Sequence, residues 1–378
     1  MAAGIDWARR GRRTVRLSPT LSRYIARHVL LGIGVAVFGL ATLALIIDTV
    51  ELLRRAADRE DATLGVVLQM AFLHLPFLTQ KLLPFAVLFG TMFSFQRLTR
   101  SQELIAARSV GVSVWQFLLP AIMVAAGLGA FVVVALNPLA SAMVARYEQL
   151  DQNYFSSRAS LATVSGSGIW LREAEAGHDV VIHARQMTRD PPVLEVVVAF
   201  FYEDGVHFVR RADAPVAQLE PGHWKLLDPV VVAADGSRTT PGDVLIPTEL
   251  TADGIQENFA PPETMSFWDL PGFIANLEAV GFSAREHRLY WHGLLALPLL
   301  LSAMLIIGTT FSLRLARHGG TGLLVAAGLV AGFAFYVLSD LVFAIGLSGQ
   351  IPVVLAAWTP AGIAILLGLT TLFHLEDG

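Results

Sequence analysis

Long runs of apolar residues dominate the chain. A membrane-spanning helix needs about 20 consecutive apolar residues, because the hydrocarbon core is roughly 30 Å thick and an α-helix rises about 1.5 Å per residue. Six runs are long enough: Val29 to Ile47, Leu64 to Phe95, Val114 to Leu136, Leu289 to Leu313, Gly322 to Leu341 and Ile351 to Leu372. The third run is expected to stop at Asn137-Pro138, since proline interrupts helices. The pattern predicts three helices, a large insert and three more helices.

The insert has a different periodicity. Short runs of β-branched and aromatic residues are separated by Gly, Pro and Asp, and such spacing is typical of a sandwich or jelly roll. These runs are 168–172, 179–187, 194–204, 206–211 and 223–234. From 264 to 280 apolar residues recur at helical spacing, which predicts a helix that leads back to the membrane.

The predicted fold class is therefore a polytopic α-helical membrane protein with six transmembrane helices and an all-β, jelly-roll-like domain between the third and fourth. The expected domains are 1–146, the first half of the transmembrane domain; 147–288, the β domain; and 289–378, the second half.

Arginines predict the orientation, because short cytoplasmic loops are enriched in Lys and Arg. They gather before the first span, between the second and third, and between the fourth and fifth, which all fall on one side. These residues are Arg9, Arg10, Arg12, Arg13, Arg16, Arg23, Arg27, Arg97, Arg100, Arg108, Arg314 and Arg317. Both termini are thus expected in the cytoplasm and the insert outside.

The segment 148–288 is acidic, with 10 Lys/Arg against 21 Asp/Glu. A nucleic-acid partner would need a clustered basic face, which this charge pattern does not provide.

Composition agrees with a membrane protein and excludes several enzyme classes. The chain is 54% hydrophobic and 15% charged, and it has no cysteine, so disulfides and thiolate metal sites are excluded. Neither of its two lysines, Lys81 and Lys225, follows a glycine, so the chain lacks the P-loop of an ATPase. The histidines have no metal-ligand spacing. No catalytic residue, metal or cofactor is expected in this chain.

The cytoplasmic loop from Arg97 to Ser113 is the most informative segment. Its sequence, RLTRSQELIAARSVGVS, predicts a short amphipathic helix over about 98–110 that begins at Ser101 and ends at Gly111. Glu103 lies in the first turn, where the helix dipole favours an acid. A helix exposed between two membrane helices can dock on a motor domain, although an ordinary capped interfacial turn has the same composition.

Several motifs in order resemble the LptF/LptG family of lipopolysaccharide export permeases, and the LptG branch more than LptF. They are the six spans with a β insert after the third, SQELIAARSVGVS, Pro76 and Pro84, Gly168-Ile169-Trp170, and AGFAFYVLSD at 331–340. The resemblance covers about Leu21 to Phe373.

The resemblance implies an assembly and its energy source. An LptF-like chain would pair with this chain, and an LptB-like ATPase dimer would bind ATP and magnesium in the cytoplasm. Lipopolysaccharide would pass through a membrane-anchored LptC-like protein to an LptA-like periplasmic bridge. The helix at Glu103, with Arg100, Leu104 and Gly111, would be the coupling helix that docks on the ATPase.

The family also places basic residues at the outer end of the first span, where they meet lipid A phosphates. Arg54 and Arg55 match that position, and an arginine pair suits phosphate well. Asp48 and Glu51 precede them and can neutralise part of their charge. Interfacial arginines that only reach for water remain an alternative.

Lys81 is the most costly residue for a membrane helix, since a lysine near the middle of a span must face a cavity or a partner. It can line the substrate cavity, pair with an acid on a partner chain, or bind a carbonyl freed by Pro84.

The expected function is a non-catalytic inner-membrane permease subunit for lipopolysaccharide. The alternative is a membrane-anchored periplasmic scaffold or sensor without transport activity.

Overall fold

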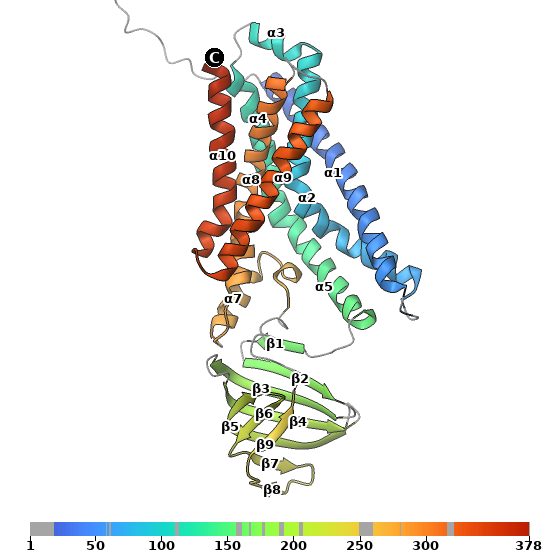
Figure 1. Ribbon diagram of the computed structural model, residues 1–378, viewed down its shortest axis with the longest axis vertical. Helices are drawn as coiled ribbons and strands as arrows, with labels where there is room; N and C mark the ends of the chain where they lie inside the picture. The colour runs from blue at the N-terminus through green and yellow to red at the C-terminus, as the bar shows by residue number, and fades with distance from the viewer. Residues whose placement is uncertain are drawn as a thin grey trace, which may run out of the picture.

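The computed structural model describes residues 19–57, 59, 62–109, 113–155, 161–165, 168–175, 178–188, 193–203, 207–248, 260–279, 281–315 and 321–377. Its long helices form one bundle, and its strands form a separate domain at one end of that bundle (Figure 1). Within the described residues, six helical stretches are long and apolar enough to cross a membrane, and the antiparallel sheet lies between the third and fourth. The predicted fold class is confirmed.

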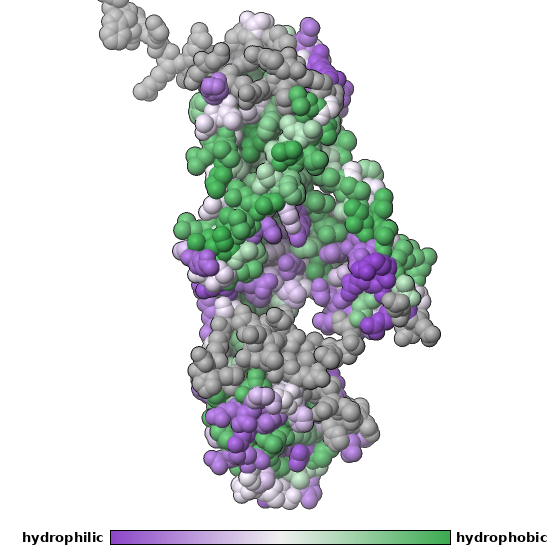
Figure 2. All heavy atoms as spheres, in the orientation of Figure 1, coloured by the Kyte–Doolittle hydropathy of each residue, from purple (hydrophilic) through white to green (hydrophobic). Residues whose placement is uncertain are grey.

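The helical elements are longer than the apolar runs that predicted them. The helices are α1 (Pro19–Ala56), α2 (Leu64–Arg100), α3 (Glu103–Ser109), α4 (Val114–Phe131), the π-helical η1 (Val132–Leu136), α5 (Asn137–Tyr154), the 3-10 turn η2 (Pro262–Thr264), α7 (Leu270–Ala279), α8 (Arg285–Leu315), α9 (Thr321–Ser348) and α10 (Val353–Asp377). On the face shown in Figure 2, apolar side chains cover the middle of the bundle, and polar side chains gather where α1 and α5 end near the β domain.

The third membrane helix does not stop at Asn137-Pro138, so that prediction is wrong. α4 continues through η1 into α5, which runs to Tyr154 and therefore crosses the expected boundary at residue 146. In η1 the Asn137 N–H donates to Val132 O, five residues earlier. Pro138, which has no N–H to offer, then stands in the first turn of α5. The wider π turn lets the helix pass a residue that would interrupt regular α-helical bonding.

α1 lies along α2, and the two helices approach closely at Gly32 and Gly90. A methyl group on Gly90 would lie 2.5 Å from the backbone of Ile33, so a larger residue would push the helices apart. Beside this contact, the Ser94 hydroxyl donates to His28 O at 3.1 Å. Small residues allow this close packing in membranes, where van der Waals contact replaces the hydrophobic effect between helices.

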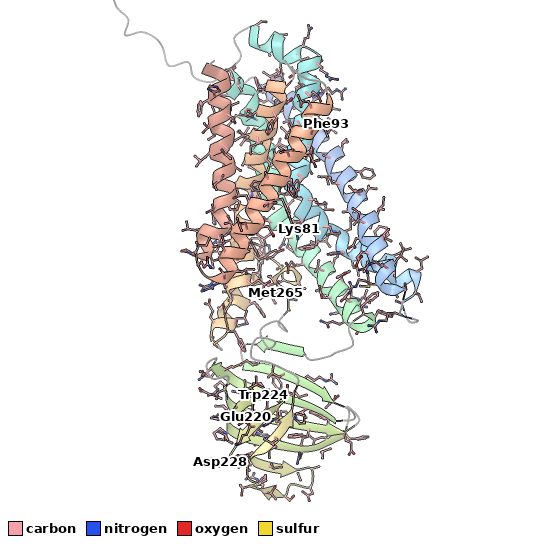
Figure 3. The ribbon with its side chains drawn as sticks, in the orientation of Figure 1. Lys81, Phe93, Glu220, Trp224, Asp228 and Met265 are labelled. Carbon is pink, nitrogen blue, oxygen red and sulfur yellow. The ribbon has the colours of Figure 1, made fainter. Side chains whose placement is uncertain are left out.

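The β domain is an antiparallel sheet whose strands mostly pair in chain order: β1-β2-β3-β4-β5-β6-β9, with β7 between β5 and β8. Its strands are β1 (Leu161–Ser165), β2 (Gly168–Glu175), β3 (His178–Thr188), β4 (Val193–Glu203), β5 (His207–Glu220), β6 (His223–Leu227), β7 (Val230–Ala233), β8 (Arg238–Thr239) and β9 (Val244–Pro247). The predicted run 223–234 divides at Asp228, whose φ is 48°. Trp224, labelled in Figure 3, is fully buried in the core with Ile169 and Ile182.

α7 joins the β domain to the bundle. Leu270, in its first turn, is buried in the apolar cluster of the membrane helices. Ile274 and Leu277, further along the same helix, are buried in the core of the β domain. Residues 264–280 were predicted to lead back to the membrane as a helix, and α7 forms the later part of that segment. One helix therefore contributes side chains to both cores.

Candidate functional site

A short helix in the expected loop lies at the end of the bundle opposite the β domain, as α3 (Figure 1). It is shorter than the predicted 98–110, because α2 continues to Arg100 and includes Leu98. Ser101, which was expected to begin the new helix, ends α2 instead, and its hydroxyl donates to Leu98 O at 3.2 Å. The chain turns at Gln102, whose φ of 59° lies in the left-handed region.

Glu103, the first residue of α3, is held by α1. The Tyr24 hydroxyl donates a hydrogen bond of 2.6 Å to Glu103 Oε2. Hydrogen bonds from Tyr24 and then Ser101 lower the pKa of the Glu103 carboxyl, so the exposed side chain carries a negative charge. Tyr24 was missed by the sequence analysis, because no local pattern reveals a partner 79 positions away.

The other residues expected around Glu103 have different surroundings. Leu104 is 5% exposed and packs in an apolar cluster with Leu98 and Phe117, so it anchors α3 to the bundle. Arg100 is exposed at the end of α2. Gly111 lies outside the described residues. The outward face of α3 is formed by Glu103, Ala106 and Ser109, which are exposed.

The basic pair in the last turn of α1 is divided between two acids. Arg54 holds Glu51 of the same helix through two hydrogen bonds of 2.9 and 2.7 Å, with 75% of the arginine side chain exposed. Arg55 instead reaches α5, where its Nη2 lies 2.7 Å from Asp151 Oδ1. Its guanidinium also lies 4.9 Å from the centre of the Phe155 ring.

These two ion pairs differ in their exposure to solvent. An exposed ion pair within one helix adds little stability, so Glu51 holds Arg54 only weakly. Arg55 is only 36% exposed, and its pair with Asp151 ties α1 to α5. Asp48, which was expected to compete for the arginines, lies 3.0 Å from the His74 ring instead.

Lys81 is exposed on α2 and lies near the middle of the bundle (Figure 3). It makes no hydrogen bond or ion pair with the residues that the structure describes, so a carbonyl freed by Pro84 does not hold it. Its charge acts on Glu263 of η2: burial raises the pKa of the Glu263 carboxyl, and Lys81 partly counteracts that rise. The sequence analysis missed Glu263, which is remote from Lys81 in the chain.

Asn137 is a further residue whose structural role the sequence analysis did not identify. It is 1% exposed, and its Oδ1 accepts the Phe267 N–H at 2.8 Å. Its Nδ2 donates to the Tyr290 hydroxyl at 3.4 Å. Asn137 thereby links α5, α8 and the segment after η2. Its position before a proline resembled the end of a helix and concealed this role.

Histidines in the β domain are engaged in local contacts. His183 packs on the Trp170 ring with centroids 4.4 Å apart, and His223 Nε2 lies 3.2 Å from Glu220 Oε2. In the described part of the chain, no group of three or more His, Cys, Asp or Glu could hold a metal ion.

Comparison with known proteins agrees with this architecture. Residues 23–374 match the model of the family described as lipopolysaccharide export system permease LptF/LptG. The lipopolysaccharide export system permease protein LptG of Escherichia coli K12 is 25% identical over 375 residues, which cover 94% of this chain and 98% of that protein. The LptG protein of Haemophilus influenzae is 21% identical, over 92% of this chain and 96% of its own length.

The family match includes all six candidate spans and the sheet between them, except for the ends of the first and last helices. A match of this length, on a chain with this arrangement of helices and strands, identifies a multi-pass membrane protein that belongs to the LptF/LptG family of lipopolysaccharide export system permeases.

Proposed function

We propose that this chain is the LptG-like subunit of a transporter that extracts lipopolysaccharide from the inner membrane and passes it to a periplasmic bridge. The family match over residues 23–374 carries this proposal. The chain itself is non-catalytic. ATP and magnesium bind an LptB-like ATPase dimer, an LptF-like chain completes the permease, and LptC-like and LptA-like proteins receive the lipid.

The proposed orientation follows from the arginines. The termini and α3 are cytoplasmic and the β domain is periplasmic, because Arg97 and Arg100 lie at the α3 end of α2. Of the arginines used for this prediction, those before residue 19 and Arg317 lie outside the described residues. The ATPase then binds at α3, and lipid leaves near the β domain.

α3 has the properties of a docking helix. Glu103 presents a negative charge on its exposed face, while Leu104 and the Tyr24 hydrogen bond fix the helix to α1 and α2. A push on the outward face is therefore transmitted to the two helices that border the proposed lipid cavity. Arg100, at the end of α2, contributes to the same cytoplasmic surface.

The substrate side is proposed at α1 and α2. In the most apolar window of α1 only 6% of the residues are buried, which leaves a face for acyl chains and the partner permease. Arg54 supplies the more available guanidinium for a lipid phosphate, Arg55 lies beside it, and Lys81 is proposed to face the cavity.

Reconstitution tests the proposal. The chain, an LptF-like chain and an LptB-like ATPase are placed in liposomes with lipopolysaccharide, and transfer to a soluble LptA-like acceptor is measured with and without ATP. We expect transfer that requires both ATP and this chain. A chain that binds the periplasmic protein but neither retains the ATPase nor supports transfer would be a scaffold, and the proposal would be wrong.

A further inference from the structure

A hollow between α1 and α2 opens in the half of the bundle that carries α3. Its volume is about 740 Å³. Gly32, Ala36 and Gly39 line it on α1. The two helices are in close contact at Gly32, whereas the space around Gly39 is open. Phe89 and Phe93 form its wall on α2, and Figure 3 shows Phe93 nearer to α3 than Lys81 is.

One end of the hollow is basic. Arg27 of α1 and Arg97 of α2 both line it, and no acidic residue does. Both side chains are exposed, and neither forms an ion pair with a residue that the structure describes. The hollow therefore combines an apolar body with two guanidinium groups that have no ion-pair partner among the described residues, although the Glu103 carboxylate acts electrostatically on Arg97. This is the pattern that complements a phosphate attached to an acyl chain.

The length of the hollow fits one lipid leaflet. Lining residues extend along α1 from Arg27 to Leu40, a distance of about 20 Å at the helical rise. One leaflet contributes about 15 Å of the hydrocarbon core. An acyl chain can thus lie in the hollow while its headgroup stays at the arginines, at the membrane surface.

We propose that the hollow between α1 and α2 is a binding site for an anionic phospholipid, whose phosphate contacts Arg27 and Arg97. In the orientation proposed above, on which the choice of leaflet rests, this lipid belongs to the cytoplasmic leaflet. The site is separate from Arg54 and Arg55, which lie at the other end of α1.

The site adjoins the coupling helix. His28 lines the hollow, its Nδ1 lies 3.0 Å from Tyr24 O, and its ring packs on the Tyr24 ring with centroids 4.2 Å apart. Tyr24 in turn donates to Glu103. A bound lipid would consequently stabilise the segment of α1 on which α3 rests.

Photocrosslinking at Phe93 tests the proposal. The full chain, with p-benzoylphenylalanine in place of Phe93, is placed in nanodiscs of mixed phosphatidylglycerol and phosphatidylcholine, and the adducts are identified by mass spectrometry. We expect phosphatidylglycerol to be preferred, and that preference to fall about tenfold in Arg27→Gln with Arg97→Gln, because two charge-assisted contacts are lost. This measurement needs no ATPase, so it is independent of lipid export.

Two controls complete the design. Arg23→Gln removes an exposed arginine of α1 outside the hollow and should keep the preference, and the same photoreactive residue at Phe131, exposed on α4, should show none. Equal labelling by both lipids, or a preference unchanged in the double variant, would overturn the proposal in favour of bulk lipid. Crosslinking at Phe93 in intact cells to lipopolysaccharide or to another protein, instead of phospholipid, would also overturn it.

Discussion

The Tyr24 hydroxyl and the Glu103 carboxylate are joined by a hydrogen bond of 2.6 Å that connects the start of α1 to the start of α3. Glu103 thus has two tasks in the proposed mechanism: its charge faces the cytoplasm, and its Oε2 fixes α3 to α1. A substitution that reverses the charge also removes the hydrogen-bond acceptor. Variants that separate the two tasks are therefore more informative than charge reversal alone.

Glu103→Lys should uncouple ATP hydrolysis from lipid export, because like charges that face each other across an interface cost several kcal/mol. Glu103→Gln keeps an acceptor for Tyr24 but removes the charge, and Tyr24→Phe removes the hydrogen bond but keeps the charge. We expect Glu103→Gln to weaken ATPase binding more than Tyr24→Phe does. Co-purification of the ATPase and ATP-dependent export are measured for each, and normal assembly and export by Glu103→Lys would contradict the coupling role.

Arg54 and Arg55 should have different roles: Arg54 should contact the ligand, and Arg55 should stabilise the contact between α1 and α5. Arg54→Glu should weaken lipopolysaccharide crosslinking about tenfold, since a charge-assisted contact is lost. The melting temperature should change little, because the Glu51 pair is exposed. Asp151→Ala, which removes the acceptor for Arg55, should mainly lower the melting temperature. The double variant Arg54→Glu with Arg55→Glu should show both effects. Unchanged crosslinking in that variant, with a lowered melting temperature, would reject the phosphate contact.

Lys81 should affect the pKa of Glu263, and this effect should be visible in the pH dependence of the stability of the fold. Burial raises the pKa of Glu263 above its ordinary value of 4.5. Between pH 4.5 and the raised pKa, Glu263 is therefore more protonated in the folded chain than in the unfolded chain. The free energy of unfolding falls as the pH rises through that window. Lys81→Met should raise this pKa further and make the loss larger at higher pH. Melting temperatures from pH 4 to 8 check this, and Lys81→Met combined with Glu263→Gln should be less pH-dependent than Lys81→Met alone. An identical pH profile in both would exclude the coupling.

The absence of cysteine makes the topology directly testable. Thr240→Cys places one thiol on an exposed turn of the β domain, and Ala106→Cys places one on the exposed face of α3. A membrane-impermeant maleimide applied to intact spheroplasts should label Cys at 240 and spare Cys at 106. The reverse pattern would invert the orientation and every proposal built on it.

Much of the architecture was determined by the sequence. Apolar runs about 20 residues long must cross the membrane as helices, because unsatisfied backbone groups are too costly in lipid. Alternating β-branched residues between turn signals likewise predicted the sheet. Successive side chains of a strand point to opposite faces, and in β2 Ile169 is accordingly buried while Trp170 is exposed. The short helix at Glu103 was also predictable, but its predicted start at Ser101 is wrong, because α2 continues to Arg100 and ends at Ser101.

Only the tertiary structure decided which side chains meet. Tyr24 with Glu103, Arg55 with Asp151, Asn137 with Tyr290, and Lys81 near Glu263 are all pairs between distant segments. Local periodicity sets which face of a helix is apolar, but the contacts across the bundle depend on how whole helices pack. The hollow at Gly32 illustrates the same limit: a small residue in an apolar run predicts nothing until a second helix, with Phe93 and Arg97, is placed against it.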